Sequence, residues 1–321
     1  MTAKLAFVFP GQGSQHPGML RELAERYSVV RSTFEEASSA LGYDLWHKVQ
    51  EGSAEELSAT VVTQPALLTS SVAIWRVWQE LEGARPTVLA GHSLGEYSAM
   101  VCAGALSFAD GVRLVRLRAE AMQEAVPEGS GAMAAIIGLA DEQVETACAE
   151  AAQGEVVAAV NYNSPGQVVI AGDRQAVERA IENCKAAGAK RALPLPVSVP
   201  SHCELMRPAA ERLAQALADI EVKTPRYPVV QNVDAQSHDD VAVLSERLVE
   251  QLYRPVRWSS CVEEIKARDV SLCVECGPGK VLTNLSKRID RSLVSLAVND
   301  PETLGTALER AREVNENSEQ A

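Results

Sequence analysis

The sequence lacks the features that mark several large classes of protein. No apolar run reaches the roughly 18 residues of a membrane-spanning helix, so no membrane span is expected. The apolar start, Leu5 to Pro10, is too short for the core of a secretory signal peptide. No continuous basic face is indicated, and the net charge is -13, which argues against binding to nucleic acid. We therefore expect neither a membrane nor a nucleic acid as partner.

A disulfide framework is also absent, because the seven cysteines are scattered and odd in number. This usage is typical of reduced thiols and predicts a cytoplasmic protein. Cys273 and Cys276 are close in sequence, but an offset of three on a predicted strand from Val270 to Glu275 turns them to opposite faces. No second pair completes a zinc site, so no metal is expected.

The chain has 321 residues, 46% of them hydrophobic, which is enough for about two domains. Predicted strands and helices alternate from Lys4 onward, as in a parallel sheet covered by helices on both faces. Helical patterns run from Met19 to Leu41 and from Gln64 to Leu81, and a later strand is predicted from Pro228 to Val233. From Gly131 the order changes to strand, helix, strand, strand, helix, strand. We predict an α/β fold in which a large α/β-hydrolase-like domain (1–127 and 199–321) carries an inserted small ferredoxin-like (βαββαβ) domain (128–198), with a substrate cleft between them.

The most informative motif is Gly91-His92-Ser93-Leu94-Gly95, which lies between a predicted strand and a predicted helix. A serine between two glycines at such a turn is held in a strained conformation with its hydroxyl exposed, and the glycines let the backbone pass closely on either side. The pattern predicts that Ser93 is the nucleophile of an acyl-transfer reaction. G-x-S-x-G also occurs by chance in Gly/Ser-rich loops, but here the flanking strand and helix favour the functional interpretation.

A serine hydroxyl needs a base, and His202 is the best candidate among the five histidines. His47 and His238 lie in surface-like segments, His92 is adjacent to Ser93 and should point away from it, and His16 belongs to a Gly-rich loop. An ordinary capping or surface role for His202 is the alternative. No acid stands out to orient it, since Glu96 is too close to Ser93 on the same helix. A backbone carbonyl can accept the second imidazole proton, so we favour a dyad over a triad.

An oxyanion needs two converging N–H groups. Leu94, the residue after the nucleophile, supplies one from the start of a helix. The Gly-rich turn Phe9-Pro10-Gly11-Gln12-Gly13 follows the first strand, and the N–H of Gln12 is the candidate for the second. The same turn could be a phosphate loop or a plain turn, but it lacks the lysine pattern of a nucleotide loop.

Five motifs together resemble one enzyme family. They are Phe9-Pro10-Gly11-Gln12-Gly13-Ser14-Gln15, Gly91-His92-Ser93-Leu94-Gly95-Glu96, Leu114-Val115-Arg116-Leu117-Arg118, Pro200-Ser201-His202 and Gln251-Leu252-Tyr253-Arg254-Pro255-Val256-Arg257-Trp258. The motifs occur in the same order as in the malonyl-CoA:acyl carrier protein transacylases of type II fatty acid synthesis. The chain resembles that family over roughly residues 4 to 300. Acyltransferase domains of polyketide synthases share these motifs, so another α-substituted malonyl donor is an alternative substrate.

The resemblance implies that the malonyl group passes from malonyl-CoA to the phosphopantetheine thiol of acyl carrier protein through an ester on Ser93. It adds two roles: Arg118 pairs with the free malonyl carboxylate, and Gln251 holds His202 through its main-chain carbonyl. Without the family, Arg118 is one of several solvated arginines on a helix from Ala109 to Glu124. No metal or redox cofactor is implied.

The carrier protein of this pathway is acidic, so a chain with net charge -13 must meet it with a local basic patch. The candidates are Lys185, Lys190 and Arg191 on the small domain and Lys287, Arg288 and Arg291 on the large one. Asn161 and Asn163, in a predicted turn between two strands, could bind the pantetheine amides or serve only the turn.

Two other classes of protein remain open. A serine thioesterase or esterase of the α/β-hydrolase type shares the Ser93 turn, but it should have an acid for its histidine and no arginine facing the acyl group. A non-catalytic module that binds carrier protein is the second. An intact set of Ser93, His202 and Arg118 favours the transferase over both.

Overall fold

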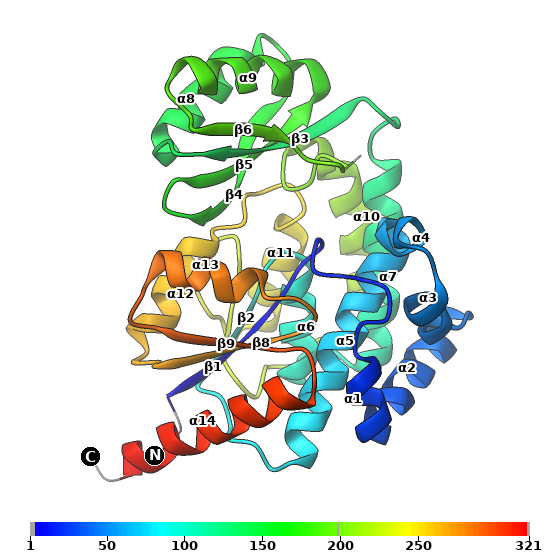
Figure 1. Ribbon diagram of the computed structural model, residues 1–321. Helices are drawn as coiled ribbons and strands as arrows, with labels where there is room; N and C mark the ends of the chain where they lie inside the picture. Colours follow the sequence, from blue (N-terminus) through cyan, green and yellow to red (C-terminus); the bar gives the residue numbers. More distant parts are fainter. Residues whose placement is uncertain (1–3, 198, 320–321) are drawn as a thin grey trace.

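The computed structural model describes residues 4–197 and 199–319, and these form two β-sheets with their helices (Figure 1). Residues 1–3, 198 and 320–321 lie outside the described residues, and so does the predicted domain boundary at residue 198. The mixed α/β fold, with one parallel and one separate antiparallel sheet, is as predicted. No helix within the described ranges is long and apolar enough to cross a membrane.

The first sheet is parallel throughout, in the order β7-β2-β1-β8-β9. Its strands are β1 (Leu5–Phe9), β2 (Val88–Gly91), β7 (Val229–Val230), β8 (Leu272–Cys276) and β9 (Val294–Val298). Neighbours on the two sides of β1 come from distant parts of the chain, and their carboxyl ends meet at one edge. This edge is where ligands bind in open parallel sheets.

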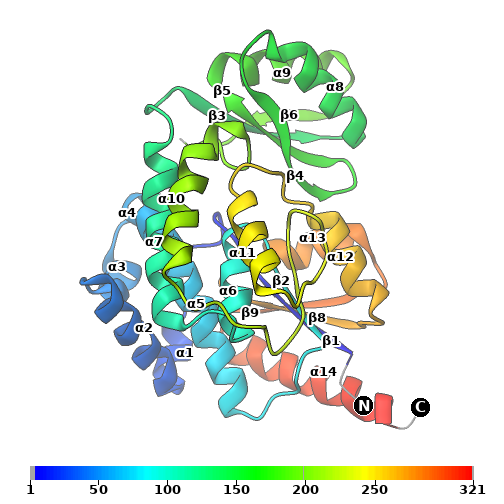
Figure 2. The same ribbon diagram turned by 180° about the vertical axis from the view of Figure 1, so that it is seen from behind.

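Helices cover both faces of the parallel sheet (Figures 1 and 2). In chain order they are α1 (Arg21–Arg26), α2 (Ser28–Leu41), α3 (Leu45–Glu51), α4 (Ala54–Ser58), α5 (Thr60–Glu80), α6 (Leu94–Cys102), α7 (Phe108–Glu124), η1 (Glu204–Met206), α10 (Arg207–Ala218), α11 (Val241–Glu250), α12 (Trp258–Ala267), α13 (Val281–Ile289) and α14 (Pro301–Glu319).

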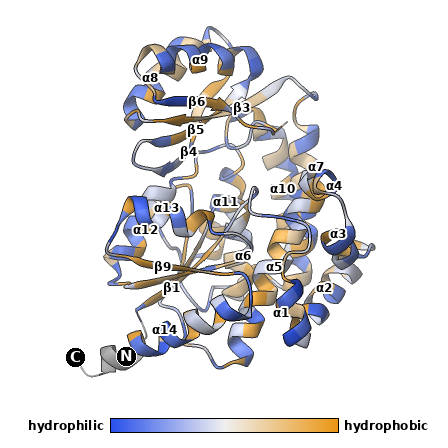
Figure 3. Ribbon diagram, in the orientation of Figure 1, coloured by the Kyte–Doolittle hydropathy of each residue, from blue (hydrophilic) through white to orange (hydrophobic). Residues whose placement is uncertain are grey.

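The alternation of side chains along β1 divides the core into two layers. Leu5, Phe7 and Phe9 join the larger apolar cluster, to which α5, α6 and α7 contribute. Ala6 and Val8 join a second cluster with α12 and α13 on the opposite face. Figure 3 shows the corresponding concentration of apolar residues on the strands and on α5.

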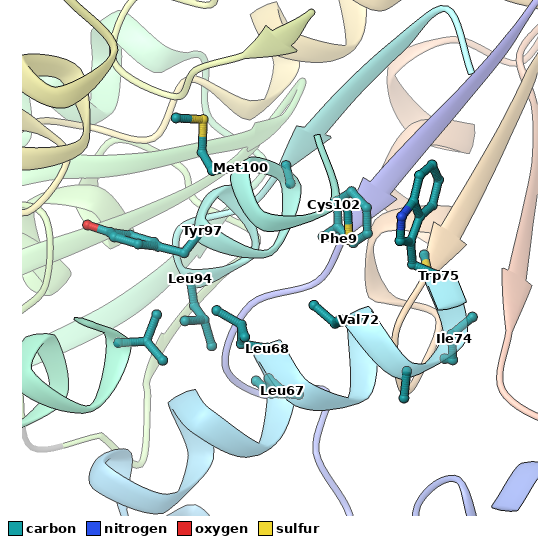
Figure 4. Packing of buried hydrophobic residues seen from close by; sticks show 14 of the residues in the cluster. Phe9, Leu67, Leu68, Val72, Ile74, Trp75, Leu94, Tyr97, Met100 and Cys102 are labelled. Atoms are coloured by element: carbon teal, nitrogen blue, oxygen red, sulfur yellow. The ribbon is translucent and has the colours of Figure 1, made fainter. Parts of the chain in front are cut away.

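Helix α6, which follows the serine turn, is fixed by packing on α5. Leu94, Tyr97 and Met100 of α6 are fully buried, and Leu67 and Leu68 of α5 lie in the same cluster (Figure 4). Burying each such side chain stabilises the fold by about 1.5–3 kcal/mol. The start of α6 is therefore held rigidly beside the end of β2.

The second sheet is antiparallel, in the order β4-β5-β3-β6. Its elements run in the predicted sequence: β3 (Gly131–Ile137), α8 (Asp141–Ala152), β4 (Val157–Ser164), β5 (Gln167–Asp173), α9 (Arg174–Ala186) and β6 (Arg191–Pro194). Figure 1 shows β4 on the side nearer the parallel sheet and the two helices on the far side. This is the βαββαβ arrangement of ferredoxin-like folds.

Two backbone hydrogen bonds join the antiparallel sheet to the rest of the fold. Tyr162 N–H donates to Val256 O, and Val256 N–H donates to Val160 O, so β4 is pinned to the segment between α11 and α12. The predicted cleft between the two parts stays a prediction. Two surface hollows of about 350 and 450 Å³ lie around α1 and α3, and neither is lined by a predicted site residue.

Some predicted elements were wrong in detail. The helical pattern of residues 19–41 is two helices that meet at Tyr27, an extended residue that caps both. The strand predicted from Pro228 to Val233 has only two residues, because the chain turns away after Val230. Helices α3, α4 and α13 were not predicted.

Candidate functional site

Ser93 lies at the turn between β2 and α6, at the carboxyl edge of the parallel sheet. Its φ of 53° and ψ of -110° are a strained conformation for a residue with a side chain. The side chain of Asn232 stabilises this conformation with two hydrogen bonds. Its Oδ1 accepts from Ser93 N–H at 2.8 Å, and its Nδ2 donates to Gly91 O at 2.7 Å. The turn is thus braced by a residue that comes from the end of another strand.

The glycines of the motif are required by close backbone approach. A Cβ on Gly91 would lie 1.9 Å from the Gly95 carbonyl, and one on Gly95 would lie 1.9 Å from Phe9 O. A Cβ on Gly11 would lie 2.7 Å from His92 O. The Gly-rich loop after β1 therefore packs directly on the serine turn, as the motif predicts.

His202 lies within hydrogen-bonding distance of Ser93. Its Nε2 is 2.8 Å from Ser93 Oγ, and its Nδ1 is 2.6 Å from Gln251 O. A carbonyl only accepts, so Nδ1 carries the proton and Nε2 is left to accept from the serine hydroxyl. The ring is 3% exposed, and His202 has a φ of 66°, so both members of the pair have positive φ.

Burial holds His202 neutral. Desolvation, followed by the positive charge of Arg118, lowers the pKa of His202 to about 3, and the bond to Gln251 O opposes this only in part. The imidazole is therefore able to accept a proton over the whole neutral range. Its proton affinity is weak until the charge of Arg118 is offset.

Arg118 is brought to the serine from α7. Its Nη2 donates to Ser93 Oγ and to Gln251 Oε1, each at 3.2 Å, and its Nη1 donates to Gln64 Oε1 at 2.8 Å. The guanidinium stacks over the ring of Tyr97 with 5.3 Å between centres, and its Nε has no hydrogen-bond partner. The site thus holds a fixed, partly unsatisfied cation next to the hydroxyl.

The expectation that Arg118 is solvated in the absence of the family resemblance is wrong, since it is only 2% exposed. Arg113 and Arg116 on the same helix pair with Asp110 and Glu120. Arg118 forms no ion pair with any residue of the described ranges. A buried charge without a counter-ion is costly, so this one is suited to an anion that arrives with the substrate.

The predicted oxyanion donors lie on the two segments that meet at the turn. Leu94 is the first residue of α6, so its N–H has no acceptor within the helix. Gln12 lies one residue after Gly11 in the loop that contacts His92, and its Oε1 accepts from Thr60 Oγ1 at 3.2 Å. The roles of Leu94 and Gln12 stay predictions.

Asn161 and Asn163 lie in strand β4 and not in a turn. Asn161 is buried, and its backbone bridges to Val256. Asn163 Oδ1 is 2.8 Å from His92 Nε2, so its side chain joins the antiparallel sheet to the serine turn. Burial lowers the pKa of His92, which keeps this contact neutral.

The cysteines agree with the prediction of separate thiols. All seven are buried and free. Cys273 and Cys276 join opposite core layers, as expected from their spacing on β8. Across residues 4–197 and 199–319, no group of three or more potential metal ligands gathers in one place.

Sequence reasoning missed four buried polar residues that build the site, namely Gln64, Glu96, Gln231 and Asn232. Glu96 was considered only as a partner for the histidine. Gln231 and Asn232 directly follow β7, the neighbour of β2, and polar residues at the end of a parallel strand are a signal that could have found them. Gln64 stands in an otherwise apolar stretch of α5.

The fold and this site define an acyltransferase. The acyl transferase domain family matches residues 6–313, and the chain belongs to that family.

Its relatives carry more specific names. A malonyl CoA-acyl carrier protein transacylase of Salmonella typhimurium is 61% identical over 305 residues, 95% of this chain and 99% of the relative. One of Bacillus subtilis is 47% identical over 317 residues, 98% of this chain and all of the relative.

Two solved structures are similar throughout. The acyl carrier protein S-malonyltransferase from Vibrio cholerae has a TM-score of 0.94 at 60% identity, covering 95% of this chain and 99% of that one. A malonyl-transacylase in complex with its type II PKS acyl-carrier protein has the same TM-score and coverage at 59% identity.

Proposed function

We propose that this protein transfers the malonyl group from malonyl-CoA to the phosphopantetheine thiol of acyl carrier protein. The observation that carries this proposal is the buried Arg118, which lies 3.2 Å from the Ser93 hydroxyl and has no anionic partner among the described residues. A malonyl thioester presents a carboxylate a few bonds from its reacting carbonyl. A guanidinium beside the nucleophile accepts that carboxylate and rejects a neutral acyl group.

The first half-reaction forms an ester on Ser93. His202 Nε2 accepts the hydroxyl proton while Oγ bonds to the thioester carbon. The tetrahedral intermediate collapses as the C–S bond breaks, and His202 returns the proton to the CoA sulfur. Arg118 binds the malonyl carboxylate, which offsets the positive charge that weakens the base.

The second half-reaction reverses these steps with another thiol. The pantetheine thiol gives its proton to His202, its sulfur attacks the ester carbon, and Ser93 leaves with the proton from His202. The N–H groups of Gln12 and Leu94 bind the oxyanion in both halves. Losing one such donor typically costs about 2.7–4 kcal/mol in the transition state.

The acidic carrier protein is best placed against α13. Lys287 and Arg288 are exposed on this helix and Arg291 follows it. Helix α13 contacts β4, the strand whose Asn163 contacts His92. The alternative basic set, which includes Lys185, is less suitable because α9 lies on the far side of the antiparallel sheet (Figure 1) and Lys185 pairs with Glu182.

The same proposal includes a cytoplasmic location and no cofactor. Seven buried free thiols suit a reducing compartment. The steps above use only side chains and backbone of this chain. We also retain the division into 1–127 with 199–321 and 128–198, which is supported by the confinement of the antiparallel sheet to residues between Gly131 and Pro194.

Transfer of label separates this function from its alternatives. The protein is incubated with labelled malonyl-CoA and then with the pantetheinylated carrier protein, in parallel with acetyl- and methylmalonyl-CoA. We expect malonyl transfer to the carrier to exceed both acetyl transfer and release of free malonate. Rapid release of free acid would indicate a thioesterase. A preference for methylmalonyl-CoA would indicate a polyketide-type donor, and the absence of turnover would indicate a binding module.

A further inference from the structure

The buried carboxylate of Glu96 lies behind the catalytic residues and contacts three of their supports. Its Oε1 accepts from Gln231 Nε2 at 3.1 Å. Its Oε2 accepts from Asn232 N–H at 2.8 Å and from Gln251 Nε2 at 2.9 Å. Glu96 is fully buried, and its carboxylate forms no ion pair with a described residue. Every neighbour donates to it, so it acts purely as an acceptor.

Gln251 connects Glu96 to the reacting groups. Its Nε2 donates both to Glu96 and to Ser93 O (3.0 Å), which leaves Oε1 facing Arg118 Nη2 at 3.2 Å. Its main-chain oxygen accepts from His202. One residue therefore contacts the backbone of the nucleophile, the base and the cation that binds the acyl carboxylate.

The orientation of the Gln251 amide is fixed by charge. A flipped amide would place Oε1 against the Glu96 carboxylate and Nε2 against the Arg118 guanidinium, so both contacts would become repulsive. In the observed orientation the amide donates to a carboxyl oxygen and accepts from a cation, and each hydrogen bond polarises the other. Burial raises the pKa of Glu96 to about 7, so the repulsion that opposes the flip is greatest above that pH, where the carboxylate is ionised. Without an acceptor at position 96, the contacts with Ser93 O and Arg118 still oppose the flip, but the amide loses its charged acceptor.

We propose that Glu96 is a positioning residue for substrate choice: it fixes the Gln251 amide so that Arg118 stays aimed at the acyl group on Ser93. This inference rests on the proposed function. Gln64 Oε1 holds the other end of the guanidinium, so the two glutamine oxygens define its plane. Loss of the Gln251 acceptor leaves Gln64 Oε1 and Ser93 Oγ as the acceptors of the guanidinium, and the second becomes an ester oxygen on acylation, so the plane of the guanidinium is held less firmly. The guanidinium is then misaligned for a bidentate pair with the malonyl carboxylate, whereas binding of an acetyl group, which has no carboxylate, is unaffected.

The test compares Glu96→Ala with Glu96→Gln. The glutamine still offers an oxygen to Gln251 and Asn232. Its amide faces Gln231, whose Oε1 has no partner, so a flip of Gln231 supplies an acceptor at the cost of its bond to Leu244 O. We expect the preference for malonyl-CoA over acetyl-CoA in acylation of Ser93 to fall about tenfold or more in Glu96→Ala. The glutamine variant should retain most of it.

Glu275 supplies the matched control. It is also a buried carboxylate that accepts backbone N–H groups, those of Leu282 and Thr283 at the start of α13, and it touches no site residue. Glu275→Ala should lower the melting temperature and leave the malonyl preference unchanged. A merely structural Glu96 would behave in the same way.

The possible outcomes distinguish failure of the proposed function from failure of the positioning role of Glu96. If the unaltered protein forms no malonyl ester on Ser93, the proposed function fails. If it does, and Glu96→Ala keeps the full malonyl preference, only the positioning role is overturned. Should the alanine variant not fold, Glu96→Asp withdraws the carboxylate by one methylene, and the same ratio decides: a fall supports the role and an unchanged ratio contradicts it.

Discussion

Arg118 Nη2 lies 3.2 Å from Ser93 Oγ, so a buried cation and the nucleophile share one hydrogen bond before any substrate is present. The two residues are 25 positions apart and come from α7 and from the end of β2. On the function proposed above, this contact couples recognition of the acyl group to activation of the serine, because the guanidinium proposed to bind the malonyl carboxylate also lowers the pKa of His202.

The first prediction concerns substrate choice. Arg118→Ala should depress transfer of malonyl and relatively favour acetyl. Leaving the malonyl carboxylate buried without its partner costs about 3–5 kcal/mol, which is a factor of about a hundred to several thousand. Arg118→Lys keeps the charge but not the planar fork and should be intermediate. Steady-state kcat/KM for malonyl- and acetyl-CoA measures this. An unchanged ratio in the alanine variant would remove Arg118 from the acyl pocket.

The second prediction concerns pH. His202 must be neutral to accept the serine proton, so acylation is lost as pH falls through its pKa. Burial, followed by the charge of Arg118, lowers that pKa to about 3, so removing Arg118 takes away the second-largest cause and the pKa rises. The acid limb of the rate of Ser93 acylation by p-nitrophenyl acetate, a neutral ester, should move to higher pH in Arg118→Ala. A limb at the same pH in both proteins would contradict the coupling.

The third prediction concerns the serine turn. Gly95→Ala places a Cβ 1.9 Å from Phe9 O, so the turn or the loop after β1 must move, at a cost of about 1–3 kcal/mol or more, with loss of activity. Gly305→Ala in α14 is the control, because nothing lies within 4 Å of its Cβ. That change should stabilise the protein by about 0.5–1 kcal/mol. Urea unfolding of both variants gives the comparison.

The fourth prediction concerns the contact between the two sheets. Asn163→Ala leaves half-buried His92 without its partner at 2.8 Å, which should lower the free energy of unfolding by about 1–3 kcal/mol. Asn183→Ala, on the outer helix α9, is the control for losing an amide away from the site. If Asn163→Ala is as stable as the unaltered protein, the contact does not join the sheets.

The sequence was sufficient for features with a local cause. The Ser93 turn was predicted because its strand, glycines and helix are adjacent in the chain, and the βαββαβ order was predicted because each element has its own periodicity. His202 was found by elimination among five histidines. The structure places its Nε2 2.8 Å from Ser93 Oγ, although 109 positions separate the two residues.

Features fixed by distant contacts could not be predicted. Asn232 braces the Ser93 turn from 139 positions away, and Gln251 contacts Glu96 across 155. The position of Asn232 just after a strand marks it as a candidate, and the family motif marks Gln251, but no local pattern shows which distant residue either side chain contacts. Helix α13 was missed for a related reason: Glu275 on β8 accepts the N–H groups at its start, and this cap comes from a strand and not from the helix itself.

The central claim is that Ser93 carries the acyl group between the two thiols. The most direct measurement is mass spectrometry of the intact protein and its peptides after incubation with malonyl-CoA, before and after addition of the carrier protein, with Ser93→Ala in parallel. The account predicts one malonyl ester on the peptide that contains Ser93, stable until the thiol arrives and absent in the variant. A malonyl group on another residue, or labelling that survives Ser93→Ala, would contradict it.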